Sequence, residues 1–275
     1  MPAHQPSAID HVKDTTEWEF FDSLFGEPKA WHLPEIFGFQ ITKFMILELV
    51  AAALILIIFI PICRRAGRGN LPKGAWSNAF ESLLTFIRSE VAQPAIGHDA
   101  DKYVPYLWTV FVFILFCNLL GMFPFLGSPT ASLAVTAGLA LFSLVMFHGA
   151  AIVKEGPIRY VKSLWPHIDV PYVGVLFSTM IFTIEFMGTF IKSAVLAVRL
   201  FANMFAGHMV LASILIFINM AAGATFTLMW SVVTVSSVLG MVALSLLELF
   251  VAFLQAYVFT FLTALFMGMS LHPEH

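Results

Sequence analysis

The segment 192–208 places charged and polar side chains inside a long apolar run that extends over residues 172–220 without a proline. Arg199 lies near the middle of this run, with Lys192 about two helical turns before it and Asn203 about one turn after it. An arginine stays protonated at every accessible pH, and an unpaired one at the centre of a bilayer costs at least ~2.5 kcal/mol. We therefore interpret Arg199 as a functional residue on an ion path, rather than as a side chain that reaches the headgroups from a helix end.

The embedded polar residues fall on distinct helix faces. In a helix over 172–220, a rotation of ~100° per residue places four polar side chains within roughly 40° of one direction. They are Glu185, Lys192, Arg199 and Asn203. His208 points to about the opposite side, ~13 Å further along the axis, and Glu248 shares a face of the last apolar segment with Gln255. A carboxylate and an imidazole can exchange protons near neutral pH, whereas a guanidinium cannot. The pattern indicates two polar regions with a fixed positive charge between them. Hydrogen bonding between helices would explain Asn203, but not the ionisable groups.

The composition is that of a membrane protein. Hydrophobic residues make up 59% of the 275 residues, charged residues only 11%, and the mean hydropathy is +0.88. Soluble domains carry about 25% charged residues. Cys63 and Cys117 lie in or beside apolar segments without the spacing of a metal site, so we expect no disulfide framework, no metal and no cofactor. Nucleic acid is not an expected partner either.

Five apolar segments are long enough to span ~30 Å of hydrocarbon: residues 44–62, 104–123, 131–153, 172–220 and 225–269. These segments predict an all-α polytopic membrane protein, with a membrane domain at 41–275 that follows an extramembrane tail at 1–40. Residues 76–96 instead have the i, i+3, i+4, i+7 apolar spacing of an amphipathic helix, which we place on the membrane surface.

The two last segments are much longer than a bilayer span. Two vertical helices would fit into 172–220, but no residue between Lys192 and Arg199 breaks a helix, which favours one strongly tilted helix. With 225–269 it would form a hairpin of two long tilted membrane helices. Glu48 and His148 also lie within apolar segments, and we interpret both as partnered or interfacial side chains.

Basic clusters at 64–73 and 154–162 follow apolar spans and predict cytoplasmic loops. This topology leaves the N-terminus outside and the C-terminus in the cytoplasm. The N-terminal segment is acidic and has neither the apolar core of a signal peptide nor the arginines of a transit peptide. We therefore expect a multi-pass protein of a bacterial plasma (inner) membrane.

Three motifs resemble one family. The stretch from Arg199 to His208, with its Arg-Leu-Phe-x-Asn-Met core, resembles subunit a of the F-type ATP synthase membrane sector. The segment 248–259 is similar to the last helix of that family, and Asn-Leu-Leu-Gly-Met-Phe-Pro at 118–124 is similar to its hairpin motif. The resemblance extends from about residue 40 to the C-terminus.

The resemblance implies a proton-translocating stator without catalytic activity of its own. Two half-channels would carry protons to and from the carboxylates of a c-subunit ring, and Arg199 would separate them. It further implies that residues 172–220 form one tilted helix. The implied partners are the c ring, the b-subunit peripheral stalk, other ATP synthase subunits and membrane lipid. The outer half-channel would contain Asn203, His208, Glu248 and Gln255, and the cytoplasmic exit would contain Glu185 and Lys192. Some bacterial members carry an acid at the position of His208 and a histidine at that of Glu248, so this chain resembles an exchanged pair of neighbours.

The alternative is a stand-alone secondary transporter or ion channel. Such proteins often contain internal repeats and helices broken at the midplane, and this sequence has no convincing repeat. A membrane hydrolase is a third option, but the sequence contains neither His-Glu-x-x-His nor Gly-x-Ser-x-Gly. Whether the ion is H⁺ or Na⁺ stays open, since the family binds it on the c ring.

Overall fold

The structure is a computed structural model and describes residues 17–18, 31–32, 35–36, 39–66, 74–123, 127–163, 174–222 and 227–271. Most of the predicted tail at 1–40 and part of the basic cluster at 64–73 lie outside the described residues. The tail contributes two short antiparallel strand pairs. These are β1 (Glu17–Trp18) with β2 (Trp31–His32), and β3 (Glu35–Ile36) with β4 (Phe39–Gln40).

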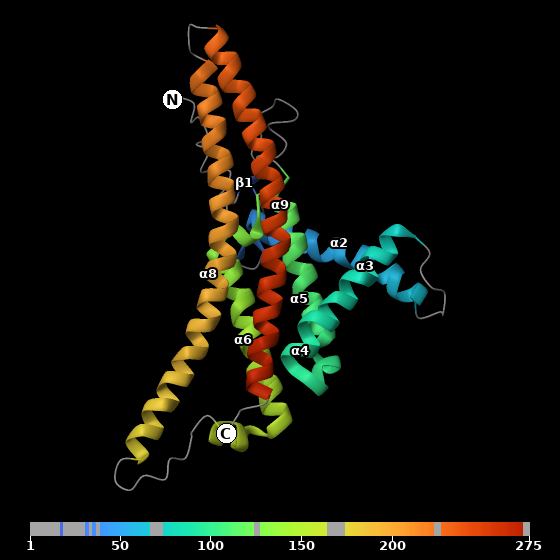
Figure 1. Cartoon of the computed structure of the whole chain (residues 1–275), viewed down its shortest axis with the longest axis vertical. Coiled ribbons are helices and arrows are strands. Elements are labelled where there is room, and N and C mark those ends of the chain that lie inside the picture. The colour runs from blue at the N-terminus through green and yellow to red at the C-terminus, as the bar shows by residue number, and fades with distance from the viewer. Residues whose placement is uncertain are drawn as a thin grey trace. The chain divides into compact units, whose positions relative to one another are not determined.

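Helices make up nearly all of the remaining described chain (Figure 1). The α-helices are α2 (Lys43–Ala66), α3 (Ala75–Phe86), α4 (Gln93–Ile96), α5 (Ala100–Gly121), α6 (Leu133–Glu155), α7 (Pro157–Ser163), α8 (Gly174–Ala222) and α9 (Thr227–Leu271). Shorter elements are the π-helical turn η1 (Ile87–Ala92) and the 3-10 turns η2 (Gly97–Asp99) and η3 (Pro129–Ala131). Within the described ranges, 5 helical segments are long and apolar enough to cross a membrane. The predicted all-α polytopic fold is confirmed.

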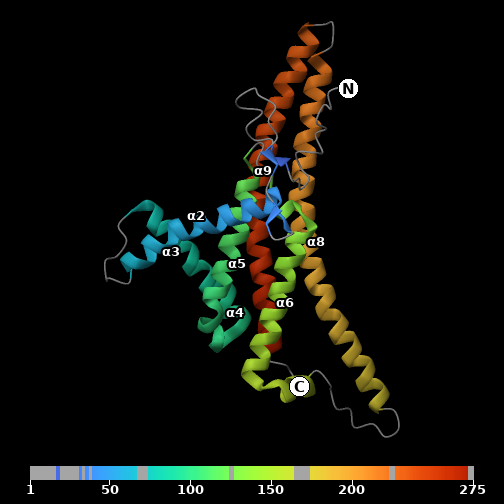
Figure 2. The same ribbon diagram turned by 180° about the vertical axis from the view of Figure 1, so that it is seen from behind.

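The long segment at 172–220 is one helix rather than two spans. Helix α8 continues without a break over 49 residues, which corresponds to ~73 Å at 1.5 Å per residue. Helix α9 returns over 45 residues. The C-terminal part of α8 and the N-terminal part of α9 lie side by side as an antiparallel hairpin (Figures 1 and 2). This arrangement brings the polar residues of the two helices together.

The predicted amphipathic helix at 76–96 is divided into α3, η1 and α4. Its apolar positions Ile87 and Val91 are fully buried, and the charged Arg88 and Glu90 are exposed. The faces therefore agree with the predicted pattern, although the middle of the segment has the wider π-helical winding. Apolar periodicity over a few turns does not distinguish the two windings, because a single π turn shifts the pattern only slightly.

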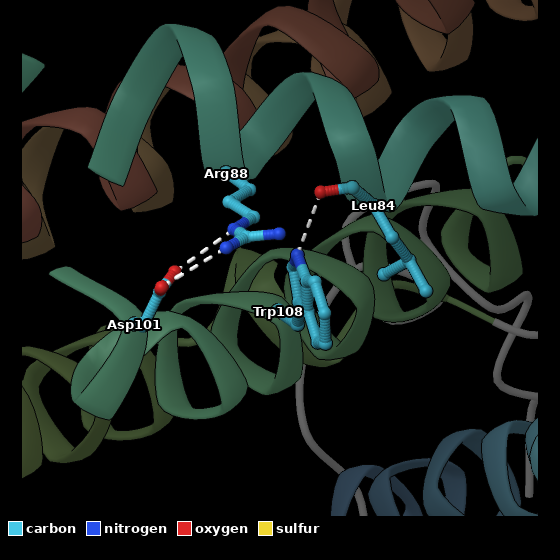
Figure 3. A network of polar contacts seen from close by, with 4 residues as sticks. All are labelled: Leu84, Arg88, Asp101 and Trp108. Atoms are coloured by element: carbon cyan, nitrogen blue, oxygen red, sulfur yellow. Dashed lines mark hydrogen bonds and ion pairs between the residues drawn. The ribbon is translucent and has the colours of Figure 1, made fainter. Parts of the chain in front are cut away.

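Contacts with α5 hold this segment in place (Figure 3). The guanidinium of Arg88 donates from Nε and Nη2 to the two carboxylate oxygens of Asp101, at 2.8 and 2.9 Å. The indole N–H of Trp108 donates to the backbone carbonyl of Leu84 at 2.8 Å. A bidentate ion pair and an indole N–H hydrogen bond thus join η1 and α3 to the first turns of α5.

Contacts divide the chain into two compact units. The first comprises residues 1–67, 112–135 and 200–256, and the second comprises 68–111, 136–199 and 257–275. The core of the first unit includes Phe44 and Leu47 of α2, Ile114 of α5 and Met204 of α8. This unit holds the turn between α5 and α6 together with the facing halves of α8 and α9.

In the second unit, α4 and η2 lie beside the ends of α6 and α9. The ammonium of Lys154 lies 2.9 Å from the Asp99 carboxylate and donates to the backbone carbonyl of Leu271 at 3.2 Å. Gly268 approaches α4 so closely that a Cβ on it would lie 1.9 Å from the carbonyl oxygen of Ala95. Three chain segments therefore meet at one end of this unit.

His148 of α6 has a partner, as its sequence interpretation requires. Its Nδ1 is hydrogen-bonded to the hydroxyl of Tyr160 in α7. Burial, together with the nearby carboxylates of Glu185 and Glu155, raises the pKa of Tyr160 to about 12. The phenol therefore keeps its proton at neutral pH and can donate it to the imidazole.

Candidate functional site

Helix α8 has a packed face and an open face. Its fully or nearly buried residues recur at helical spacing: Ser193, Leu196, Ala197, Leu200 and Met204. The predicted polar stripe lies beside this face, about a quarter of a turn away, and all of its members are exposed: Glu185, Lys192, Arg199 and Asn203. The helix thus packs through small and aliphatic side chains, and the stripe borders that packed face.

Arg199 makes no hydrogen bond or ion pair with any residue in the described parts of the chain, and its side chain is exposed. The neighbouring cation on the stripe is different, because Nζ of Lys192 lies 5.5 Å from the ring centre of Phe266. Such a cation–π contact is favourable and orients the lysine. Arg199 is therefore a permanent charge on an apolar helix without a counter-ion among the described residues.

Asn203 and Gln255 are brought together by the α8–α9 hairpin. The side-chain amide of Asn203 donates to Oε1 of Gln255 at 2.8 Å. Gln255 is only 2% exposed, and its Nε2 has no hydrogen-bond partner within the described ranges. Because a buried amide nitrogen is rarely left unpaired, this group marks a position where a small polar molecule could bind.

His208 and Glu248 are neighbours, as the sequence predicted. Nδ1 of His208 lies 3.8 Å from Oε1 of Glu248, and the two side chains are 14% and 8% exposed. This separation is too long for a direct hydrogen bond. Nε2 of His208 and Oε1 of Glu248 are both buried without a hydrogen-bond partner among the residues that the structure describes. The pair can exchange protons through a molecule between its members, but not through direct contact.

Gly207 also shapes this site, although the sequence analysis gave it no role. A Cβ on Gly207 would lie 2.8 Å from Oε1 and 3.2 Å from Cδ of Glu248. The absence of a side chain lets the carboxyl of α9 lie directly against the α8 backbone. The sequence does contain a signal for this contact, because Gly207 interrupts an otherwise regular helical pattern one residue before His208. Such a glycine often marks a close approach to another segment.

The site combines the predicted His208–Glu248 pair with the Asn203–Gln255 pair in one compact unit. Comparison with known proteins identifies the family of the chain. The sequence model described as ATP synthase A chain matches residues 45–268. The chain belongs to the ATP synthase A chain family. ATP synthase subunit a of Chloroherpeton thalassium is 36% identical over 283 residues, which cover 99% of this chain and 80% of that protein.

Two further relatives of this family agree. ATP synthase subunit a 2 of Chlorobaculum tepidum is 40% identical over 95% of this chain and 72% of that protein. ATP synthase subunit a of Chlorobium phaeobacteroides is 41% identical over 97% of this chain and 75% of that protein. The resemblance noted in the sequence is confirmed.

Membership in the ATP synthase A chain family assigns the chain to the proton-translocating CF(0) membrane sector, with other ATP synthase subunits as partners. Together with the apolar helices, it identifies a multi-pass membrane protein that takes part in ATP synthesis. Glu185 and Lys192 belong to the second compact unit, and the Asn203–Gln255 and His208–Glu248 pairs belong to the first.

Proposed function

We propose that this chain is the stator subunit through which protons reach and leave the carboxylates of a c-subunit ring. Two half-channels open to opposite sides of the membrane, and Arg199 separates them. Proton flow through the half-channels turns the ring and drives ATP synthesis. The b-subunit peripheral stalk holds the chain against rotation, and the chemical catalysis of ATP synthesis takes place on other subunits.

The observation that carries this proposal is the environment of Arg199. Its permanent charge lies on the exposed face of an apolar helix, and no described residue of its own chain neutralises it. An intramembrane guanidinium needs an anionic partner, since the hydrocarbon does not solvate it. A carboxylate on a neighbouring subunit fits this requirement, and each carboxylate that passes would be held ionised beside Arg199.

Buried polar atoms support a proton path on the proposed outer side of that charge. Asn203, His208, Glu248 and Gln255 would form the half-channel on the outer side. Its unpaired atoms, Nε2 of His208, Oε1 of Glu248 and Nε2 of Gln255, are groups that water could bridge. Glu185 and Lys192, both exposed on the stripe of α8, would line the exit to the cytoplasm.

We place the chain in a bacterial inner membrane with the N-terminus outside and the C-terminus in the cytoplasm. The membrane domain would comprise residues 41–275 and the extramembrane tail residues 1–40. The basic residues Lys154, Arg159 and Lys162 support a cytoplasmic position for the end of α6 and for α7.

Purification of the full-length chain from its native membrane tests this function. We expect a small c subunit to co-purify in several copies, and the complex to pump protons on ATP addition after reconstitution into vesicles. A chain that purifies without c subunits and still carries protons in vesicles would instead be a stand-alone transporter or channel.

A further inference from the structure

A chain of buried polar side chains connects the turn between α5 and α6 to the backbone of α9. Asn118, Ser128 and Thr130 are each at most 1% exposed. None of them is ionisable, and the sequence analysis gave them no role in proton movement. Buried polar groups in a membrane segment need a reason to be retained, because apolar side chains would pack there without a desolvation penalty.

The hydrogen bonds of this cluster run in one direction. The hydroxyl of Thr130 donates to Oδ1 of Asn118 at 2.7 Å, so the hydroxyl of Ser128, also at 2.7 Å, must donate to Thr130. Asn118 then has only its NH₂ group left to offer. That group donates to the backbone carbonyl of Ala252 at 3.1 Å. Because a backbone carbonyl can only accept, Ala252 fixes the orientation of the Asn118 amide, and the amide in turn fixes the direction of both hydroxyl bonds. The amide thereby holds α9.

The position of Ala252 gives this contact its significance. Ala252 is fully buried and lies one turn after Glu248 and nearly one turn before Gln255, on the face that meets α8. It packs in one cluster with Ala131 of η3 and Met204 of α8. Asn118 therefore bonds to the α9 backbone between the two proposed proton-path residues, and its hydrogen bonds do not involve either of their side chains.

A close backbone approach keeps the turn in place. A Cβ on Gly121 would lie 2.3 Å from Cβ and 2.9 Å from Cα of Ser128. Only glycine permits the end of α5 to lie so near the turn. The backbone N–H of Ala131 donates to the carbonyl of Ser128 at 3.0 Å, which closes the 3-10 turn. The start of the hydrogen-bond chain is thus anchored on rigid backbone.

Apolar packing alone would leave the register of α9 weakly determined. Association of membrane helices gains little from hydrophobic burial, and the contact of α9 with α8 at Ala252 uses small and aliphatic side chains. A slip by one residue would rotate every α9 side chain by ~100° and move it by ~1.5 Å. Such a slip would break the Asn203–Gln255 bond and separate His208 from Glu248.

We propose that Asn118, Thr130 and Ser128 form a positioning clamp that sets the register of α9, so that Glu248 and Gln255 face their partners on α8. The clamp acts through the main chain of Ala252 and does not itself carry protons. Its effect on pumping rests on the proposed function, whereas its effect on register does not.

The test measures register and pumping separately. The reporter of register is a chain with Met204→Cys and Ala252→Cys in which Cys63 and Cys117 are alanine. The yield of a short thiol cross-link between α8 and α9 measures the register.

Thr130→Val removes the hydroxyl with little change of shape. We expect it to lower the cross-link yield and, in a chain without the cysteine pair, to slow ATP-driven pumping about tenfold. Thr130→Ser should restore both. Thr109→Val is the matched control, because among the described residues the Thr109 hydroxyl bonds only to the Pro105 carbonyl of its own helix.

A second variant keeps the test decisive if Thr130→Val fails to assemble. The double variant Asn118→Leu with Thr130→Val replaces both partners of the Thr130–Asn118 hydrogen bond by apolar groups. No buried amide oxygen is then left without its donor at position 118, which favours assembly. We expect this double variant to retain its c subunits but to show the same loss of cross-linking and pumping. Unchanged cross-linking and pumping would overturn the clamp. Slow pumping with unchanged cross-linking would overturn it too, because the cluster would then affect pumping without setting the register of α9. The clamp variants could lose the cross-link while a separate Arg199→Ala variant of the complex pumps normally. That combination would refute the proposed function and leave the clamp standing.

Discussion

Gly207 of α8 and Glu248 of α9 lie so close together that a methyl group added to Gly207 would require the Glu248 carboxyl to shift. A Cβ on Gly207 would lie 2.8 Å from Oε1 of Glu248, and the imidazole of the next residue, His208, lies 3.8 Å from the same oxygen. The carboxyl is therefore held between the α8 backbone and a histidine. This geometry gives the position of Glu248 a steric as well as a chemical basis.

Gly207→Ala is expected to displace the Glu248 carboxyl and to slow ATP-driven proton pumping about tenfold, while the complex stays assembled. The measurement is acidification of inverted membrane vesicles after ATP addition. Gly138→Ala on α6 serves as the control, because a Cβ there would meet nothing within 4 Å. Equal pumping by the Gly207 and Gly138 variants would show that the contact has no functional consequence.

Glu248→Gln keeps the shape of the side chain but removes its capacity to gain and lose a proton. We expect slow pumping in an assembled complex, because the outer half-channel would lose one of its two exchangeable groups. Glu81→Gln is the matched control, since Glu81 is exposed on α3 and belongs to the other compact unit. Pumping at the unsubstituted rate in Glu248→Gln vesicles would remove Glu248 from the path.

The membrane orientation can be tested with single cysteines in a chain that lacks Cys63 and Cys117. Phe123, at the end of α5, is 60% exposed and Ile158 of α7 is 72% exposed, so cysteines at either position should be reachable by a reagent. We expect a membrane-impermeant thiol reagent to label Phe123→Cys only from outside and Ile158→Cys only from the cytoplasmic side. Labelling of Ile158→Cys from outside would invert the proposed topology.

The parts of the fold that depend on local geometry could be predicted from the sequence. A proline-free apolar run keeps ~100° per residue, so the shared stripe of Glu185, Lys192, Arg199 and Asn203 could be predicted from spacing alone. The same reasoning gave a single helix at 172–220, which the structure has as α8, Gly174–Ala222. Helix positions and faces are thus encoded within a few turns of chain.

Contacts between distant segments could not be predicted in this way. Asn118 and Ala252 are separated by 134 positions, and their bond joins a side chain to a backbone carbonyl that every residue possesses. The contact of Gly207 with Glu248 depends on how closely α8 and α9 approach, which neither helix determines alone. Periodicity indicates which face is buried, but not which atoms meet there.

Proton flux through the membrane sector of Arg199 variants tests the central claim most directly. Vesicles that carry the complete complex are compared for ATP-driven pumping and for passive proton leak, with Arg159→Ala on the exposed surface of α7 as the control. We expect Arg199→Ala to abolish pumping and to open a leak, because the charge that separates the half-channels is gone. Arg199→Lys should also fail to couple, since an ammonium lacks the planar fork and can lose its proton. Full ATP-driven pumping by Arg199→Ala would contradict the stator function proposed for this chain.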